Sequence, residues 1–451
     1  MSEKIICDNC IQERYLRETI ARLDEQGVCD FCGLSSYCIG LDELTGRIDE
    51  AFTQHFELSF EDEQGENPGS GTVAIIMDIA GIDEVPAKAI KDKLEEIYYN
   101  FDDAAAGILG EYSDDVYYLP RDPDVRDLEI EWREFEKTLK TEARFFNSTG
   151  LNLLNSVFDR IEEFKSADGL AVLRTIGPGT DLTSLSRARV FQSPSKLKKA
   201  MEEVTSQLGP PPSEFAVAGR MNAAGISVFY GADSIEGAIA EVRPPIGAQV
   251  LIGDFVLDRK INVLDLTAIP VIKVCGSYFD EVFNDQKRKS KFLQTLASQM
   301  AQPVLPDDQA SAYLVTQAIA DFLASKSPVS IDGIIYPSVQ SSNESKNIML
   351  FHKAARVDAE ERSNLEIEAE VIARDEDGYY PDYQIIKTKT IDKRFPRGYI
   401  SDKRRITLKL NQQSLAVYHL RSVDFKMQEF PVRILERTEQ PPSASDYEMP
   451  F

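Results

Sequence analysis

The stretch AGRMNAAGISVFYGADSIEGAIAEVRP, residues 218–244, combines a glycine-bracketed turn, a strand pattern and a helix pattern. Gly219 and Gly225 bracket the turn, and the run GISVFY predicts a strand that ends at Tyr230. The following run SIEGAIAEV predicts a short helix that carries Glu241. A strand end, the turn before it and the helix after it can bring polar side chains to one pocket.

Three side chains of this stretch suit a phosphate-bearing aromatic ligand. The guanidinium of Arg220 can clamp a diphosphate, and the ring of Tyr230 can stack on a planar group. The carboxylate of Glu241 can stabilise positive charge on a sugar. The turn is expected to place Arg220 and Asn222 at a surface. The alternative is that Glu241 and Arg243 are surface charges and that Tyr230 belongs to the core.

Short strand patterns alternate with helical ones after about residue 168. The runs GLAVLRTI, AQVLIGDFVL, INVLDLT, GIIYPS and NIMLF predict strands, and Ser338 ends the fourth of them. Longer helices are predicted near 278–300 and 309–326. After residue 355 the chain has a polar, β-rich character.

The region from about 75 to 165 has a helical pattern. One amphipathic helix is predicted from a face that repeats at helical spacing, comprising Trp132, Phe135, Leu139, Ala143 and Phe146. Asn147 is a candidate cap for the next helix. Residues 57–72 are acidic and rich in Gly, Pro and Ser, which predicts a loop or linker.

Four cysteines near the N-terminus form two CxxC pairs separated by 18 residues. They are Cys7, Cys10, Cys29 and Cys32. Such pairs can wrap a tetrahedral Zn²⁺, and so short a segment needs metal binding in place of an extensive core. The alternatives are a redox dithiol or two disulfides. We expect Cys38 to be a buried thiol and Cys275 to lie in a core.

The overall composition limits the class of protein. The chain has 451 residues, with 50 Lys+Arg and 75 Asp+Glu, a formal charge of −25. This charge argues against a protein that binds nucleic acid over its whole surface. No apolar run approaches the roughly 20 residues that span a bilayer, and no secretory signal pattern begins the sequence. A cytoplasmic, multidomain protein without membrane contact is expected.

The order of these motifs resembles the RES domain, a family of NAD⁺-consuming toxins related in fold to ADP-ribosyltransferases. The resemblance covers roughly 170–355 and rests on the AGRMNxxG turn, the Tyr and Glu at fixed spacing after Arg220, and the GIIYPS and NIMLF strands. The run SLSRARVF, with Arg187 and Arg189, resembles the family's first strand. The cysteine-rich start resembles the zinc-bearing helical extension of some members.

The resemblance implies a catalytic set of Arg220, Tyr230, Glu241 and Ser338, with Arg187, Arg189 and Asn222 as substrate-binding candidates. It implies cleavage of the nicotinamide–ribose bond of NAD⁺, with inorganic phosphate or water as acceptor, in an NAD⁺-degrading toxin or defence effector. Candidate partners are an antitoxin or immunity protein and a second copy of the chain. One alternative is an ADP-ribosyltransferase that modifies a macromolecule. The other is a non-enzymatic adaptor that binds through its zinc module and a basic patch.

The fold class predicted from these features is α+β and multidomain. We expect a four-cysteine zinc module at 1–40, a helical domain at 41–166, an ADP-ribosyltransferase-like mixed α/β RES domain at 167–355, and a β-rich extension at 356–451.

Residues 387–409 reverse the charge of the whole chain. They hold nine Lys/Arg against Asp392 and Asp402, a local balance of +7. One interpretation is a hairpin that is salt-bridged to acidic parts of the chain or to a second protomer. The other is an anion site, with Phe395 and Tyr399 available for stacking.

Overall fold

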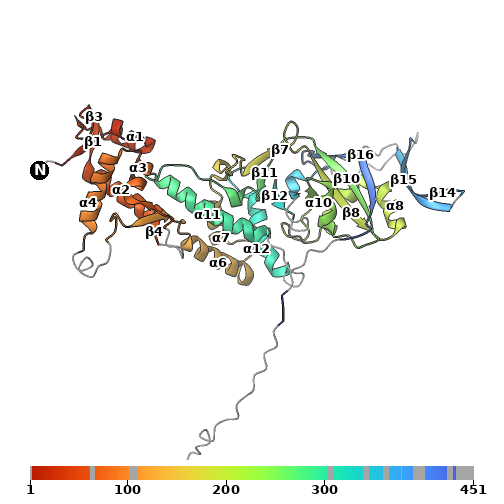
Figure 1. Ribbon diagram of the computed structural model, residues 1–451. Coiled ribbons are helices and arrows are strands. Elements are labelled where there is room, and N and C mark those ends of the chain that lie inside the picture. The colour runs from red at the N-terminus through yellow and green to blue at the C-terminus, as the bar shows by residue number, and fades with distance from the viewer. Residues whose placement is uncertain are drawn as a thin grey trace, which may run out of the picture.

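The computed structural model is an α+β protein that describes residues 3–60, 67–100, 110–301, 309–338, 345–358, 365–376, 378–389, 402–423 and 430–432. The described strands form one eight-stranded sheet, two three-stranded sheets and one two-stranded sheet. An N-terminal unit lies at one end of the molecule, helices lie in the middle, and the large sheet follows (Figure 1).

The N-terminal unit contains short strands and four helices. Its elements are β1 (Ile5–Cys7), α1 (Arg14–Leu23), β2 (Gln26–Val28), β3 (Ser35–Gly40), α2 (Leu41–His55), β4 (Phe56–Ser59), β5 (Ser70–Gly71), α3 (Thr72–Ala80), α4 (Glu84–Tyr98) and β6 (Tyr117–Pro120). The cysteine-rich segment and the helices after it share one hydrophobic core that extends from Ile6 to Tyr118.

The predicted loop at 57–72 is partly strand. Its described ends form β4 and β5, which both pair with β6. Residues 61–66 lie outside the described part. The sequence prediction was therefore wrong at both ends of this range, because pairing with β6 overrides the polar composition.

Four helices pack together in the middle of the molecule (Figure 1). They are α6 (Arg126–Thr141), α7 (Ser148–Val157), α11 (Glu281–Ala301) and α12 (Gln309–Ser325). Trp132, Phe135 and Leu139 are buried as predicted. However, α6 ends before Ala143, and Phe146 is 96% exposed. Here the amide nitrogen of Asn147 donates to the Thr138 hydroxyl, while its oxygen caps α7.

The large sheet has the strand order β16-β10-β8-β9-β13-β12-β11-β7. Its strands are β7 (Leu173–Ile176), β8 (Ser184–Phe191), β9 (Phe229–Ala232), β10 (Gln249–Leu257), β11 (Ile261–Asp265), β12 (Gly333–Pro337), β13 (Lys346–Leu350) and β16 (Leu408–His419). Only β11 and β12 run parallel to each other; the other neighbours in this sheet are antiparallel. Each of the six strand runs named from the sequence between 168 and 351 contains a strand, but β9 begins at Phe229 and continues past the predicted end at Tyr230 to Ala232.

Strands β8 and β9 are neighbours in the large sheet but are paired over a very short length, and we call this place the seam. In the described register these strands pair only through Ser186 and Ala232, whereas β8 and β10 pair along their whole length. Two helices lie between β8 and β9 in sequence, α8 (Pro194–Glu202) and α9 (Val204–Leu208), and α10 (Ile235–Val242) lies between β9 and β10. The turn at 218–225 and α10 flank β9, so the stretch 218–244 lies at this seam.

The C-terminal part contributes β16 to the large sheet and a separate hairpin of β14 (Leu365–Asp375) and β15 (Gly378–Lys389). The hairpin lies at the end of the molecule opposite the N-terminal unit (Figure 1). Among the described residues, none of the helices has the length and apolarity that crossing a membrane requires.

Candidate functional site

The turn that carries Arg220 is braced by Asn222. The side-chain nitrogen of Asn222 donates to the carbonyl oxygens of Val217, Ala223 and Ile226. Asn222 is 4% exposed, so the expected surface position is wrong for this residue. Its amide satisfies three backbone carbonyls that the short turn leaves without helix or sheet partners. Asn222 therefore fixes the shape of the turn from inside.

Arg220 is held by the two long helices. Its Nη1 donates to the carbonyl oxygen of Met300 at 3.1 Å, near the end of α11. Its own carbonyl accepts from the Thr316 hydroxyl on α12, and Gln317 Nε2 donates to the carbonyl oxygen of Gly219 at 2.8 Å. The turn and its guanidinium are thus fixed by contacts that are about 80 to 100 residues away in sequence.

Tyr230 lies in β9 and points back to this turn. Its hydroxyl donates to Asn222 Oδ1 at 2.8 Å and lies 3.4 Å from the Met221 backbone nitrogen, which donates to it. Burial raises the pKa of Tyr230, and the negative charge of Glu241 acts in the same direction. The phenol therefore stays protonated at neutral pH, and it can orient a ligand but cannot act as a base.

Glu241 lies in the last turn of α10. Ser234 caps this helix, because its hydroxyl oxygen accepts from the Gly237 backbone nitrogen at 3.1 Å. Gly237 lies so close to Ser345 that a Cβ there would meet the Ser345 hydroxyl oxygen at 2.7 Å. The absence of a side chain thus allows α10 to lie against the residue preceding β13. The Glu241 carboxylate, on an exposed residue, accepts from Asn347 Nδ2 at 2.7 Å.

The charges of Arg220 and Glu241 act on a second tyrosine. Burial raises the pKa of Tyr336 in β12; the charge of Glu241 raises it further, and that of Arg220 lowers it. Tyr313 of α12 also interacts electrostatically with both Tyr230 and Tyr336. Tyr230 bonds to the turn that carries Arg220, and Glu241 bonds to Asn347, which lies opposite Tyr336 in the sheet. We call Arg220, Tyr230, Glu241, Tyr313, Tyr336 and Asn347 the seam cluster.

Three members of the seam cluster were missed from the sequence. Tyr313, Tyr336 and Asn347 lie in runs that read only as helix or strand. The signal for two of them is the register of β12 and β13, which places Tyr336 opposite Asn347. No spacing within a single motif shows this pairing.

The two arginines of β8, Arg187 and Arg189, lie in different surroundings. The Arg187 guanidinium lies 4.8 Å from the centre of the Phe229 ring, and its buried Nη1 has no partner among the described residues. Burial and the charge of Arg189 lower the pKa of Arg187 to about 10, so it remains charged at neutral pH. Arg189 is exposed and donates to the Gln207 carbonyl at 3.0 Å.

Ser338 lies just after β12, two residues beyond Tyr336. It is fully buried, and its backbone nitrogen donates to the Ser345 carbonyl at 2.9 Å. Residues 339–344, which follow it, lie outside the described part. The described contacts therefore place Ser338 at the same end of β12 as Tyr336 of the seam cluster.

The four cysteines of the N-terminal unit meet as predicted. Their sulfur atoms all lie within 4.8 Å of one another. Individual Sγ distances are 3.5 Å for Cys7 to Cys32, 3.7 Å for Cys7 to Cys10 and 3.8 Å for Cys10 to Cys29. A tetrahedral Zn²⁺ with bonds of about 2.3 Å to sulfur separates its ligands by about 3.8 Å, whereas a disulfide bond is about 2.05 Å long. The donors fit a four-coordinate metal.

The other two cysteines lie outside this cluster. Cys38 is buried, as expected. Cys275 is exposed, so its predicted place in a core was wrong. The apolar run around it leads into the segment before α11 and does not form a strand.

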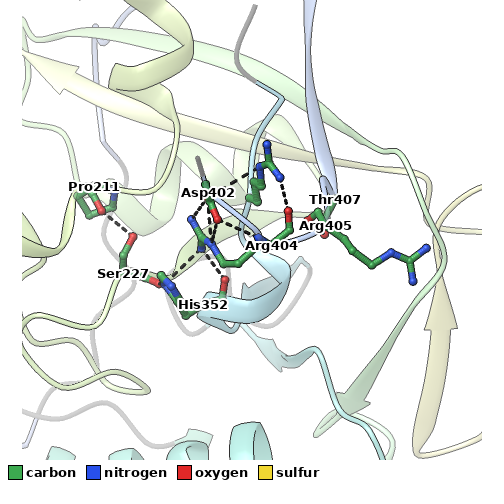
Figure 2. A network of polar contacts seen from close by, with 8 residues as sticks. Pro211, Ser227, His352, Asp402, Arg404, Arg405 and Thr407 are labelled. Atoms are coloured by element: carbon green, nitrogen blue, oxygen red, sulfur yellow. Dashed lines mark hydrogen bonds and ion pairs between the residues drawn. The ribbon is translucent and has the colours of Figure 1, made fainter. Parts of the chain in front are cut away.

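A large cavity lies away from the seam cluster. It has a volume of about 1270 Å³, and none of the predicted catalytic residues lines it. Its polar wall is internally paired (Figure 2). Arg404 donates to Asp402 at 2.7 Å and to the His352 carbonyl at 2.6 Å, and His352 Nδ1 donates to the Ser227 carbonyl at 3.1 Å. These hydrogen bonds connect separate segments of the chain, and they already occupy polar atoms of Arg404, Asp402 and His352.

The basic segment 387–409 is only partly described, since residues 390–401 lie outside the described part. Within the described remainder, Arg404 pairs with Asp402, and Lys409 pairs with Asp258. For these two cations the ionic partners are carboxylates of the same chain.

The comparison with known families identifies one segment of the chain. Residues 188–370 match the family model of the RES domain. The RES segment contains Arg189, Arg220, Tyr230, Glu241 and Ser338, and Arg187 precedes it by one residue. No curated protein and no solved structure matches the chain.

Proposed function

We propose that the seam cluster is the catalytic site of an enzyme that degrades NAD⁺ by cleaving the bond between nicotinamide and ribose. The main support is that a turn, a strand and a helix of the RES segment bring Arg220, Tyr230 and Glu241 to the seam cluster, where Tyr230 bonds to the turn and Glu241 bonds to Asn347. A dinucleotide needs a cation for its phosphates, a ring for nicotinamide and a carboxylate near the ribose. This cluster holds one of each.

The reaction needs no general acid, because nicotinamide leaves as a neutral base from a cationic pyridinium. The bond between C1′ and the ring nitrogen breaks, and its electron pair stays on nicotinamide. Glu241 stabilises the positive charge that develops on the ribose, and Arg220 holds a phosphate. Tyr230, a phenol fixed by Asn222, orients the leaving ring. An oxygen of phosphate or water then bonds to C1′, and the water loses a proton.

Arg187 has a role that follows from its unpartnered nitrogen. A buried guanidinium N–H without an acceptor is unfavourable unless a ligand supplies one. We assign Arg187 to the diphosphate of the substrate. Arg189 already donates to Gln207, and its predicted role in binding would require this contact to break. Ser338 would contact the ligand near the cleaved bond.

The four cysteines would hold a structural Zn²⁺. Four thiolates complete a tetrahedral shell and leave no open position for chemistry. When bound, the metal would stabilise the N-terminal unit, and the residues that hold it are Cys7, Cys10, Cys29 and Cys32.

The test incubates the full-length protein with NAD⁺, with and without inorganic phosphate, and identifies the products by chromatography and mass spectrometry. We expect free nicotinamide together with ADP-ribose, or with its 1″-phosphate when phosphate is the acceptor. Glu241→Gln should lower the rate at least about 100-fold, because it removes the charge that stabilises the transition state. Unchanged NAD⁺ under both conditions would refute the proposal. ADP-ribose attached to a macromolecule would favour the transferase alternative.

A further inference from the structure

Asn347 carries a buried acceptor that the protein does not satisfy. The residue is 2% exposed, and its Nδ2 donates to Glu241 at 2.7 Å. Its Oδ1 has no hydrogen-bond partner among the described residues. A carboxylate can only accept, so the amide nitrogen must face Glu241 and the oxygen must face away from it. The hydrogen bond to the Glu241 carboxylate therefore fixes the orientation of the Asn347 side-chain amide.

The nearest tyrosine of β9 does not supply this donor. The register of the sheet places Asn347 between Tyr336 on β12 and Ala232 on β9. The Tyr230 hydroxyl, on the same strand as Ala232, donates its hydrogen bond to Asn222 Oδ1. Buried carbonyl oxygens in native proteins nearly always have a donor. A ligand bound in the seam cluster is the natural source of one.

We propose that Asn347 binds substrate directly, by accepting a hydrogen bond from one hydroxyl of the ribose that carries nicotinamide. This inference rests on the proposed NAD⁺-cleaving function. Its basis is the pairing with Glu241: Asn347 Oδ1, which has no donor among the described residues, and the carboxylate of the exposed Glu241 are adjacent acceptors. Two adjacent acceptors match the two neighbouring O–H donors of a ribose.

Asn347 also fixes the carboxylate beside the sugar. Its N–H holds one oxygen of Glu241, which leaves the other oxygen for the second hydroxyl. The residue thus has two separable roles: contact with the sugar and positioning of Glu241. An experiment must tell them apart.

The test compares wild type and Asn347→Ala on NAD⁺ and on analogues that lack either the 2′- or the 3′-hydroxyl of the nicotinamide ribose. With NAD⁺ we expect kcat/KM to fall about 10-fold or more, the cost of one lost hydrogen bond and a less constrained carboxylate. With one of the two analogues the difference between wild type and variant should shrink strongly, because the lost partner is already absent. Comparing both proteins on the same analogue cancels its intrinsic reactivity.

The matched control is Asn262→Ala. Asn262 lies on β11 of the same sheet, and its Oδ1 accepts from the Thr175 hydroxyl, outside the seam cluster. This variant should keep the kcat/KM of wild type. Thermal unfolding of both variants shows whether any loss of activity reflects misfolding.

Two further outcomes separate the inference from the proposed function. A loss in Asn347→Ala that is equal for NAD⁺ and both analogues would overturn the sugar contact, while leaving the NAD⁺-cleaving function intact. A folded wild type that does not cleave NAD⁺ would overturn the function. In that case, calorimetric titration with ADP-ribose decides about Asn347: weaker binding by Asn347→Ala supports the contact, and equal or absent binding overturns it.

Discussion

The guanidinium of Arg220 donates to the carbonyl oxygen of Met300, so the end of α11 holds the arginine of the seam cluster. The other end of α11 lies against the N-terminal unit, where the Phe283 ring is 5.9 Å from that of His55. One helix therefore connects the cysteine-rich unit to the candidate site. This arrangement suggests where substitutions should affect activity and where they should affect stability only.

Replacement of Arg220 by lysine should separate charge from geometry. Lysine keeps the positive charge, but its ammonium cannot hold the Met300 carbonyl and a phosphate with the planar fork of a guanidinium. We expect kcat/KM for NAD⁺ to fall at least about 100-fold. The free energy of unfolding should change by only about 1 kcal/mol, the net value of one hydrogen bond.

The control for this substitution is Arg126→Lys. Arg126 is exposed on α6 and pairs with Asp124, away from the cluster. Steady-state kinetics and chemical denaturation of both variants make the comparison. Wild-type activity in Arg220→Lys would show that the geometry of the arginine does not matter.

The stability of the interface between the N-terminal unit and α11 should depend on pH through His55. Burial and the charge of Lys287 lower the pKa of His55 to about 4, whereas the unfolded chain has a value near 6.5. Between these values the unfolded state binds a proton that the folded state does not. The contribution of neutral His55 to the free energy of unfolding is therefore fully present above about pH 6.5. It decreases as the pH falls toward 4, by at most ~3 kcal/mol.

Thermal unfolding of wild type and His55→Phe at pH 5, 6 and 7 tests this expectation. Phenylalanine suits the rings of Tyr278 and Phe283, which lie against His55, but cannot take up a proton. The wild type should lose more stability between pH 7 and pH 5 than the variant does. The same loss in both proteins would assign the pH dependence to other groups.

The sequence predicted local features well and contacts between distant segments poorly. The spacing of the CxxC pairs predicted the cysteine cluster, and Asn147 caps α7 as predicted. In contrast, the contact of Asn347 with Glu241 joins residues 106 apart and depends on the register of β13. The end of α6 was misplaced because Asn147 bonds to Thr138, a tertiary detail that no periodicity contains.

Larger-scale expectations depend on more than local patterns. The range expected as a helical domain contributes to two separate cores, one with the cysteine-rich segment and one with α11 and α12. Which helices share a core depends on how amphipathic faces meet in space. The domain boundaries and the ADP-ribosyltransferase-like character of the fold remain predictions.

Removal of the metal should unfold the N-terminal unit. The four thiolates meet within a core that includes Cys7 and Cys29, so unbound thiols would leave this core without its cross-link. Cys10→Ser should lower the bound zinc, measured by elemental analysis, and increase cleavage by protease before residue 120. Cys275→Ser is the control, because this exposed cysteine lies outside the cluster. Full zinc content in Cys10→Ser would contradict the four-thiolate site.

A methyl group at Gly219 should disturb the seam cluster from inside. A Cβ at this position would meet Asn222 Oδ1 at 2.6 Å and the Tyr230 hydroxyl at 3.0 Å, the two atoms that bond to each other. Gly219→Ala must displace one of them, so we expect kcat/KM to fall about 10-fold or more. Gly46→Ala is the control: it lies in α2 with open space around it, and alanine should stabilise that helix by up to about 1 kcal/mol. Full activity in Gly219→Ala would mean that the Tyr230–Asn222 contact does not position the site.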